Sequence, residues 1–507
     1  MSTSKRVIKN TLFLYIRTIV SLVISIFTTR ILLDALGASD YGLYSVVGGA
    51  IAMLGFLSAS LGSSTQRFLS YAEGAGEQEK IEKYFNNSVI LHYGLAIIMV
   101  GIFVLGGIFF FNGILNIPEG KHNTAIIIYV CMLISTVFSI TIVPYEAEIN
   151  AHENMLFYSI LGILDVLFKF TIAITIFYLN GDKLIFYAIL MAIESFVLRC
   201  VCQCYCKRKY RECRHTHLRK NYDKGIIKEM TAFAGWNLSN IATGMIALYG
   251  MNIVINHYFG TEVNAAMGIA TQLSGVMMGL SMNMIKAITP VLVKSEGGNQ
   301  HQRMLDISYT SCKYSYLLFS FACIPILIFI PKVLSVWLTI VPEWTQAFCV
   351  TLIIATLIDQ LTVVLYQSIL AGGDIKNYNI ARSICNIIPL LISILIFQYT
   401  NAAPYWILIN WIIFKAIGGG IINLYYSCSK LGLSFHIFQQ RVLLPVFLST
   451  ISIIVYGLLI LNICQILNIN ELLGLLFTFI GILPLFWITA IPENERNILK
   501  LFIYKII

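Results

Sequence analysis

Long apolar runs separated by short polar segments dominate this chain. An α-helix needs about 20 apolar residues to cross the hydrocarbon core of a bilayer, and the apolar runs repeatedly reach that length. The predicted spans are 11–33, 44–65, 88–112, 124–144, 157–179, 184–204, 232–257, 265–292, 314–331, 345–371, 378–399, 404–428, 440–462 and 472–491. The pattern predicts an all-α polytopic membrane protein with about 14 transmembrane helices.

The composition agrees with this pattern and excludes an ordinary soluble domain. Apolar residues make up 58% of the 507 residues, charged residues make up 12%, and the mean hydropathy is +0.80. A soluble domain carries about 25% charged residues. Apolar surface of this extent has to face lipid, so the bilayer is the expected environment.

The N-terminal segment reads as a first transmembrane helix rather than as a cleaved signal. Lys5, Arg6 and Lys9 precede an apolar run over 11–33 that is too long for the core of a signal peptide. No pattern of small residues typical of a cleavage site follows it. We therefore expect this helix to direct membrane insertion.

Lysine and arginine fall unevenly on the two sides of the predicted membrane. If the N-terminus is cytoplasmic, the inside loops hold 25 basic residues, Lys313 and Arg382 among them, and the outside loops hold 4. Cytoplasmic loops are the ones enriched in lysine and arginine. The bias predicts a multi-pass protein whose N- and C-termini both face the cytoplasm. All outside loops are short, which leaves no external domain to carry out chemistry.

The second half of the chain repeats landmarks of the first half. Leu36-Gly37 and Glu73-Gly74 correspond to Phe259-Gly260 and Glu296-Gly297 at an offset of 223 residues. Tyr145 and Glu153 likewise correspond to Tyr366 and Asp374 at an offset of 221. An even number of spans in each half gives parallel repeats, with substrate expected between them near the midplane. Chance similarity between apolar sequences is the alternative.

The repeat divides the chain into four parts. We expect an N-terminal six-helix lobe over 1–204, a basic cytoplasmic linker over 205–228 and a C-terminal six-helix lobe over 229–428. Two additional helices and a short cytoplasmic tail follow over 429–507. The linker is rich in lysine and arginine, so it fixes the topology and meets anionic membrane lipids.

Thr29-Arg30-Ile-Leu-Leu-Asp-Ala-Leu-Gly37-Ala-Ser-Asp-Tyr41-Gly42 resembles the start of the Wzx-type polysaccharide flippases. The segments from Pro144 to Glu153 and from Ser368 to Asp374 also resemble inside loops of that family, which belongs to the MATE-like transporter superfamily. The resemblance implies two V-shaped six-helix lobes that open alternately to each side of the bacterial cytoplasmic membrane. It also implies a substrate, an undecaprenyl-pyrophosphate-linked oligosaccharide that serves as a repeat unit for O-antigen, capsule or exopolysaccharide.

Cations inside the predicted spans are the candidate contacts for the substrate. A charge at the membrane centre costs about 2.5–3.5 kcal/mol on insertion scales, so each one requires an explanation. The candidates for binding phosphate or sugar are Arg17, Arg30, Lys286, Lys415 and Asn240. Arg17 and Lys286 could instead extend to the headgroups, Arg30 could anchor at the interface or pair with Asp34, and Asn240 could serve helix packing.

Three acids in the predicted spans are candidates for coupling transport to an ion: Asp165, Glu194 and Asp359. Asp165 stands four residues before Lys169, the favourable order for an ion pair on a helix, and Glu194 is a second acid at similar depth. Asp359 and Lys415 fall near the middle of their spans, so a pair between them is the structural interpretation. A titrating acid that couples transport to protons or sodium is the functional one.

The cysteines and histidines near the linker give only a weak metal signal. Cys200, Cys202, Cys204, Cys206 and Cys213 crowd the end of one span, with His215 and His217 close by. Their spacing differs from that of structural zinc sites. We therefore expect reduced thiols, no resident metal and no cofactor.

Three function classes remain after these observations. A lipid-linked oligosaccharide flippase is favoured by the cations in the spans, and a MATE-type drug/cation antiporter is kept open by Asp165 and Glu194. A membrane enzyme would need an external catalytic loop, which the short outside loops do not supply. We expect membrane lipids as surroundings, a polysaccharide polymerase or glycosyltransferase as a possible protein partner, and no nucleic acid.

Overall fold

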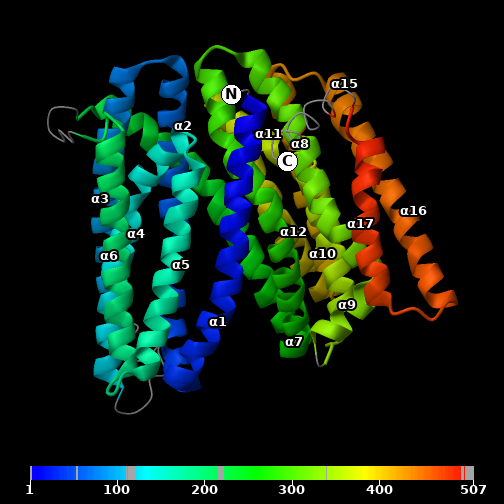
Figure 1. The fold of residues 1–507 in the computed structure, drawn as a ribbon, viewed down its shortest axis with the longest axis horizontal. Helices are drawn as coiled ribbons and strands as arrows, with labels where there is room; N and C mark the ends of the chain where they lie inside the picture. Colours follow the sequence, from blue (N-terminus) through cyan, green and yellow to red (C-terminus); the bar gives the residue numbers. More distant parts are fainter. Residues whose placement is uncertain are drawn as a thin grey trace, which may run out of the picture. The chain divides into compact units, whose positions relative to one another are not determined.

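The computed structural model describes residues 3–52, 55–109, 111, 121–214, 222–338, 340–492 and 496. Every regular element in these ranges is helical (Figure 1). The predicted fold class, an all-α polytopic membrane protein, is confirmed. His215 and His217 lie outside the described residues.

The first of two compact units consists of residues 1–238 and 297–299. Its helices are α1 (Thr3–Ala52), α2 (Gly55–Ala75), α3 (Gln78–Phe109), α4 (His122–Ala151), α5 (Met155–Tyr178) and α6 (Lys183–Lys209). Helix α1 packs along α5, and α4 packs along α6, with α2 and α3 against α4. The start of α7 (Lys224–Gly297) belongs to this unit as well, where the Ser60 and Ser64 hydroxyls of α2 donate to backbone oxygens of α7.

The second unit consists of residues 239–296 and 300–507. After the rest of α7, its helices are α8 (His301–Ile328), α9 (Ile330–Trp337), α10 (Thr345–Gln360), α11 (Val363–Gly372), α12 (Lys376–Tyr399), α13 (Trp406–Asn410), η2 (Trp411–Gly418), α14 (Gly419–Leu431), α15 (Phe435–Phe438), η3 (Gln439–Leu443), α16 (Leu444–Ile466) and α17 (Glu471–Thr489). The last two pack on each other and on α8. The four-part division expected from the sequence, with its boundaries at 204, 228 and 428, stays a prediction.

Two glycines at equivalent places in the repeat bend the longest helices. Gly37 in α1 has φ 76° and ψ 165°, and Gly260 in α7 has φ 84° and ψ −178°. This backbone region is open essentially to glycine alone, because a Cβ would clash there. The two landmarks chosen from the sequence therefore have the same backbone conformation. The predicted spans 232–257 and 265–292 lie on the two sides of the kink at Gly260, where two helices meet within α7 without a loop between them.

Twelve helices in the described part of the chain are long and apolar enough to cross a membrane. Helix α7 counts once among them although it covers two predicted spans. The predicted span 44–65 divides between the end of α1 and the start of α2, with residues 53 and 54 outside the described part. Large apolar side chains such as Ile97 and Ile253 are exposed on the surface, at 73% and 70%. Lipid would cover such side chains.

Candidate functional site

Arg382 is a buried cation in the second unit that the sequence analysis placed with an inside loop. Its assignment to a loop disagrees with the predicted span 378–399, which includes it, and with the structure, where α12 begins at Lys376 and puts Arg382 in its second turn. The Arg382 side chain is 12% exposed, and its Nη2 lies 3.9 Å from the Asp359 Oδ1 atom of α10. Its Nε and Nη1 atoms are buried and have no acceptor among the described residues.

Lys415 is a second cation in the same interior, as expected from the sequence. It lies in the π-helical segment η2, and its ammonium is 3.9 Å from the centre of the Trp411 ring. Asp359 and Arg382 both act on Lys415 electrostatically. The predicted ion pair between Lys415 and Asp359 does not form among the described residues. Asp359 faces Arg382 instead.

The second unit therefore holds two cations, Arg382 and Lys415, close to one acid, Asp359. Pi-helical turns occur frequently at functional sites, because the extra residue re-aims neighbouring side chains. A delocalised guanidinium with unfilled donors and an ammonium over an aromatic face together favour an anionic group. We call Arg382, Lys415 and Asp359 the cationic centre.

Polar side chains surround the cationic centre. The amide of Asn386 donates to the Asn240 Oδ1 atom over 3.1 Å, and Asn240 also hydrogen-bonds the Tyr366 hydroxyl. The charge of Arg382 acts electrostatically on the Tyr366 hydroxyl. Asn240, chosen from the sequence as a sugar contact, therefore lies in a hydrogen-bonded network next to buried charge. Helix packing accounts for its bond to Asn386, as the sequence alternative proposed.

Helix α14 approaches Arg382 at a glycine. A Cβ built on Gly419 would stand 1.6 Å from the Nη1 atom of Arg382, whereas one on Gly420 would reach only the Thr362 side chain, at 3.5 Å. Gly419 therefore leaves the space that the guanidinium occupies. This glycine is a position where the sequence accommodates the buried cation.

The substrate contacts predicted from the sequence divide between the units. Arg17 and Arg30 belong to the first unit, and Lys286, Lys415 and Asn240 belong to the second. Lys286 lies on α7 and is half-buried.

Arg17 packs against α5, where its guanidinium carbon lies 4.9 Å from the centre of the Tyr158 ring. Gly162 leaves the room for it, because a Cβ there would stand 2.0 Å from the Arg17 Nε atom. Arg30 is exposed, and the predicted pair with Asp34 is not among the ion pairs of the described residues.

The acids of the first unit come together as the sequence analysis proposed. Lys169 Nζ lies 2.7 Å from the Asp165 Oδ1 atom, so the predicted pair along α5 is confirmed. Glu194 of α6 is buried, accepts from the Ser195 hydroxyl over 3.3 Å, and interacts electrostatically with Asp165 and Lys169.

Sequence analysis missed Arg382 although a signal was present. Asn379, Arg382, Asn386 and Ser393 recur at spacings of three, four and seven residues, which places them on one face of a helix. All four are buried or nearly so, and Ser393 accepts from the Asn410 amide over 2.9 Å. A polar stripe inside an apolar run indicates a face that points away from lipid.

Comparisons with known proteins identify the fold and nothing finer. No family model matches the chain, and no curated protein matches it in sequence. A crystal structure of MATE in the straight conformation aligns with a TM-score of 0.70 and 14% identity, covering 84% of this chain and 96% of that one. An outward-facing multidrug resistance MATE family transporter of the MOP superfamily gives a TM-score of 0.67 and 15% identity over the same shares of the two chains. A MOP superfamily transporter from Pyrococcus furiosus, described as having a binding pocket of reverse polarity, aligns with a TM-score of 0.67 and 15% identity, again over 84% of this chain and 96% of that one.

Proposed function

We propose that this protein, which has the fold of the MATE transporters, is a flippase for a glycan linked to a lipid through pyrophosphate. It moves the lipid-linked oligosaccharide from the inner to the outer leaflet of the bacterial cytoplasmic membrane by alternating access. The observation that carries the proposal is the cationic centre, where two partly buried cations lie close to one acid.

The unfilled donors of Arg382 give the proposal its chemistry. Buried donors are nearly always hydrogen-bonded, because a lost partner costs about 1–3 kcal/mol. The buried Nε and Nη1 atoms lack an acceptor among the described residues. A phosphate group supplies two acceptor oxygens in the geometry that a guanidinium fork binds, and a pyrophosphate supplies further oxygens for Lys415.

The neighbouring structures support an anionic cargo only by analogy. The Pyrococcus furiosus transporter is described as having a binding pocket of reverse polarity, which suggests a different function. The fold thus accommodates pockets of more than one polarity, and the side chains decide the cargo. In this chain the buried side chains of the second unit favour an anion.

A MATE-type drug/cation antiporter is the second candidate, and one observation favours it. Asp165 and Glu194 interact electrostatically inside the first unit, and two interacting acids could exchange a proton for a cation. Lys169 already pairs with Asp165, however. This leaves less negative charge for a cationic drug.

Translocation by purified protein in liposomes tests the proposal. A fluorescent undecaprenyl-pyrophosphate oligosaccharide is placed in both leaflets, and a membrane-impermeant quencher reports the fraction that reaches the outer leaflet. We expect rapid exchange with the wild-type protein, and loss of exchange with Arg382→Ala and Lys415→Ala. Arg382→Lys should restore only part of the activity, because an ammonium cannot bind phosphate in two places.

Arg441→Ala is the matched control for these variants. Arg441 lies in the same unit, is 60% exposed, and pairs with Asp306 at the surface, so its loss should leave exchange unchanged. Exchange that persists in Arg382→Ala and Lys415→Ala at the wild-type rate would contradict the proposal.

A further inference from the structure

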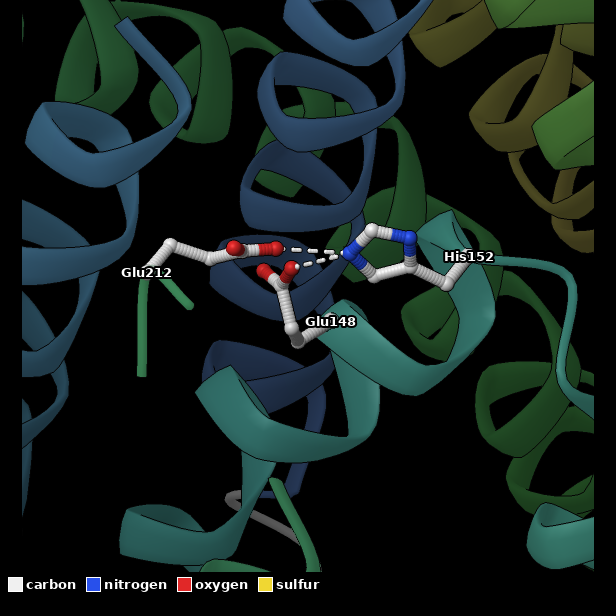
Figure 2. Close-up of side chains that lie close together, drawn as sticks. All are labelled: Glu148, His152 and Glu212. Carbon is white, nitrogen blue, oxygen red and sulfur yellow. Dashed lines mark hydrogen bonds and ion pairs between the residues drawn. The ribbon is translucent and has the colours of Figure 1, made fainter. Parts of the chain in front are cut away.

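Three side chains of the first unit converge at the end of α4. Glu148 and His152 stand one helical turn apart there, and Glu212 comes from the turn after α6 (Figure 2). The His152 Nε2 atom lies 2.6 Å from the Glu212 Oε1 atom and 2.9 Å from the Glu148 Oε1 atom. One ligand atom from each of the three residues lies within 4.8 Å of the other two. We call Glu148, His152 and Glu212 the His–Glu cluster.

The imidazole of this cluster is held in one orientation. The other ring nitrogen, Nδ1, lies 3.0 Å from the Glu73 carboxylate of α2. The Tyr210 ring stacks on the imidazole at 4.2 Å with an interplanar angle of 3°. Metal-binding histidines commonly donate their second N–H to a carboxylate, which directs the first nitrogen to the ion. Glu73 gives His152 this arrangement.

Glu148 gives the cluster a buried carboxyl group with unfilled acceptor positions. Glu148 is fully buried, and its Oε2 atom has no hydrogen-bond donor among the described residues. Gln78 donates to the Glu212 Oε2 atom over 3.2 Å, but an amide adds no charge. The nearby Arg6 guanidinium forms an ion pair with Glu153 instead, with the Arg6 Nε atom 2.7 Å from the Glu153 Oε2 atom.

We propose that Glu148, His152 and Glu212 bind a divalent transition-metal cation, Zn²⁺ or Mn²⁺, through the His152 Nε2 atom and one oxygen of each carboxylate. Bonds of about 2.0–2.1 Å in a tetrahedral site place ligand atoms about 3.3 Å apart. The present separations of 2.6 and 2.9 Å to the Nε2 atom would need to widen by about 0.7 and 0.4 Å to reach this spacing. One imidazole and two carboxylates form a donor set that zinc and manganese accept.

The bound ion would join parts of the chain that are distant in sequence. It would tie the end of α4 to the turn that follows α6 and precedes the start of α7. Glu73 would hold the imidazole from α2. The ion is therefore a structural clamp on one end of the first unit, and it is independent of the cationic centre and of the transported substrate.

The second unit offers a matched control. Glu296 stands at the repeat position of Glu73, and its carboxylate lies 2.7 Å from the His301 Nδ1 atom. There the His301 Nε2 atom donates to the Leu431 backbone oxygen over 2.7 Å. Among the described residues, His301 belongs to no group of three possible metal ligands. A histidine–carboxylate pair without the two further acids should not bind the ion.

Metal binding by the tag-free, full-length protein in detergent tests this proposal. Calorimetry with Mn²⁺ and with Zn²⁺ should give one ion per chain, and saturating Mn²⁺ should raise the apparent Tm. Glu148→Gln and Glu212→Gln should each weaken binding by roughly tenfold or more and abolish the rise in Tm, because each removes a ligand. His301→Asn should bind as the wild type does.

Folding and alternative ligands are checked in the same series. Glu148→Gln keeps the size of the side chain and replaces a fully buried carboxyl whose Oε2 atom has no donor among the described residues, so the metal-free variant should be monodisperse, with an apparent Tm no lower than that of the wild type. The absorption spectrum of the Co²⁺ complex should lack a sulfur-to-cobalt charge-transfer band. Binding by the cluster variants at wild-type affinity, no stoichiometric binding at all, or a sulfur band from Cys206 or Cys213 would each overturn the proposal.

Discussion

The bend at Gly260 gives the sharpest test of how this fold is built. An alanine at φ 84° and ψ −178° would hold its Cβ in a backbone region that only glycine occupies readily. We expect Gly260→Ala to destabilise the protein by about 1–3 kcal/mol, the strain of one residue in such a region. No atom lies within 4 Å of the new Cβ, so the cost comes from the backbone and not from packing.

A second glycine of α7 provides the control for this substitution. Gly268 is helical and exposed, and a Cβ there would meet nothing within 4 Å. Gly268→Ala should therefore stabilise the helix by about 0.5–1 kcal/mol, because alanine loses less backbone entropy than glycine. The same change in one helix thus has opposite signs at the two positions.

Thermal unfolding of the two purified variants in detergent measures this contrast. The apparent Tm of Gly260→Ala should fall below that of the wild type, and that of Gly268→Ala should equal or exceed it. An unchanged or raised Tm for Gly260→Ala would refute the reasoning, since it would mean that α7 straightens at that point without strain.

Two further predictions concern the interiors of the units. Gly419→Ala should push the Arg382 guanidinium from its place and reduce glycan exchange roughly tenfold or more, since a hydrogen bond to a charged group contributes about 1.5–3 kcal/mol. Gly420→Ala, where the new Cβ makes ordinary contacts, should leave exchange unchanged. Equal effects of the two substitutions would contradict the placement of Arg382. Glu194→Gln removes a titratable carboxyl that interacts with Asp165, so it should abolish any dependence of exchange on a proton gradient. An unchanged dependence, measured in liposomes across an imposed pH difference, would remove this pair from ion coupling.

The helices were predictable from the sequence because a helix that faces lipid needs a long run of apolar residues. Runs of about 20 apolar residues mark spans without knowledge of their partners, and the glycine landmarks at Gly37 and Gly260 marked two equivalent bends. Asp165 and Lys169 were predictable as a pair because four residues set their distance on one helix. Each of these features depends on local geometry.

Features that depend on contacts between helices were not predictable in the same way. The burial of Arg382 near the start of α12 was missed for this reason, and the contact of Asp359 with Arg382 rather than with Lys415 depends on how α10 and α12 pack. The His–Glu cluster joins residues about 60 positions apart through the turn after α6. No spacing along the chain records such a meeting.

The most direct test of the central claim follows the lipid-linked oligosaccharide by leaflet in the bacterium of origin. Deletion of the gene should leave the intermediate at the inner leaflet and remove the surface polymer. Arg382→Ala should reproduce this loss, and Arg441→Ala should not. If the surface polymer persists in the deletion strain and the cells become sensitive to cationic drugs, the protein is a drug/cation antiporter and the flippase assignment is wrong.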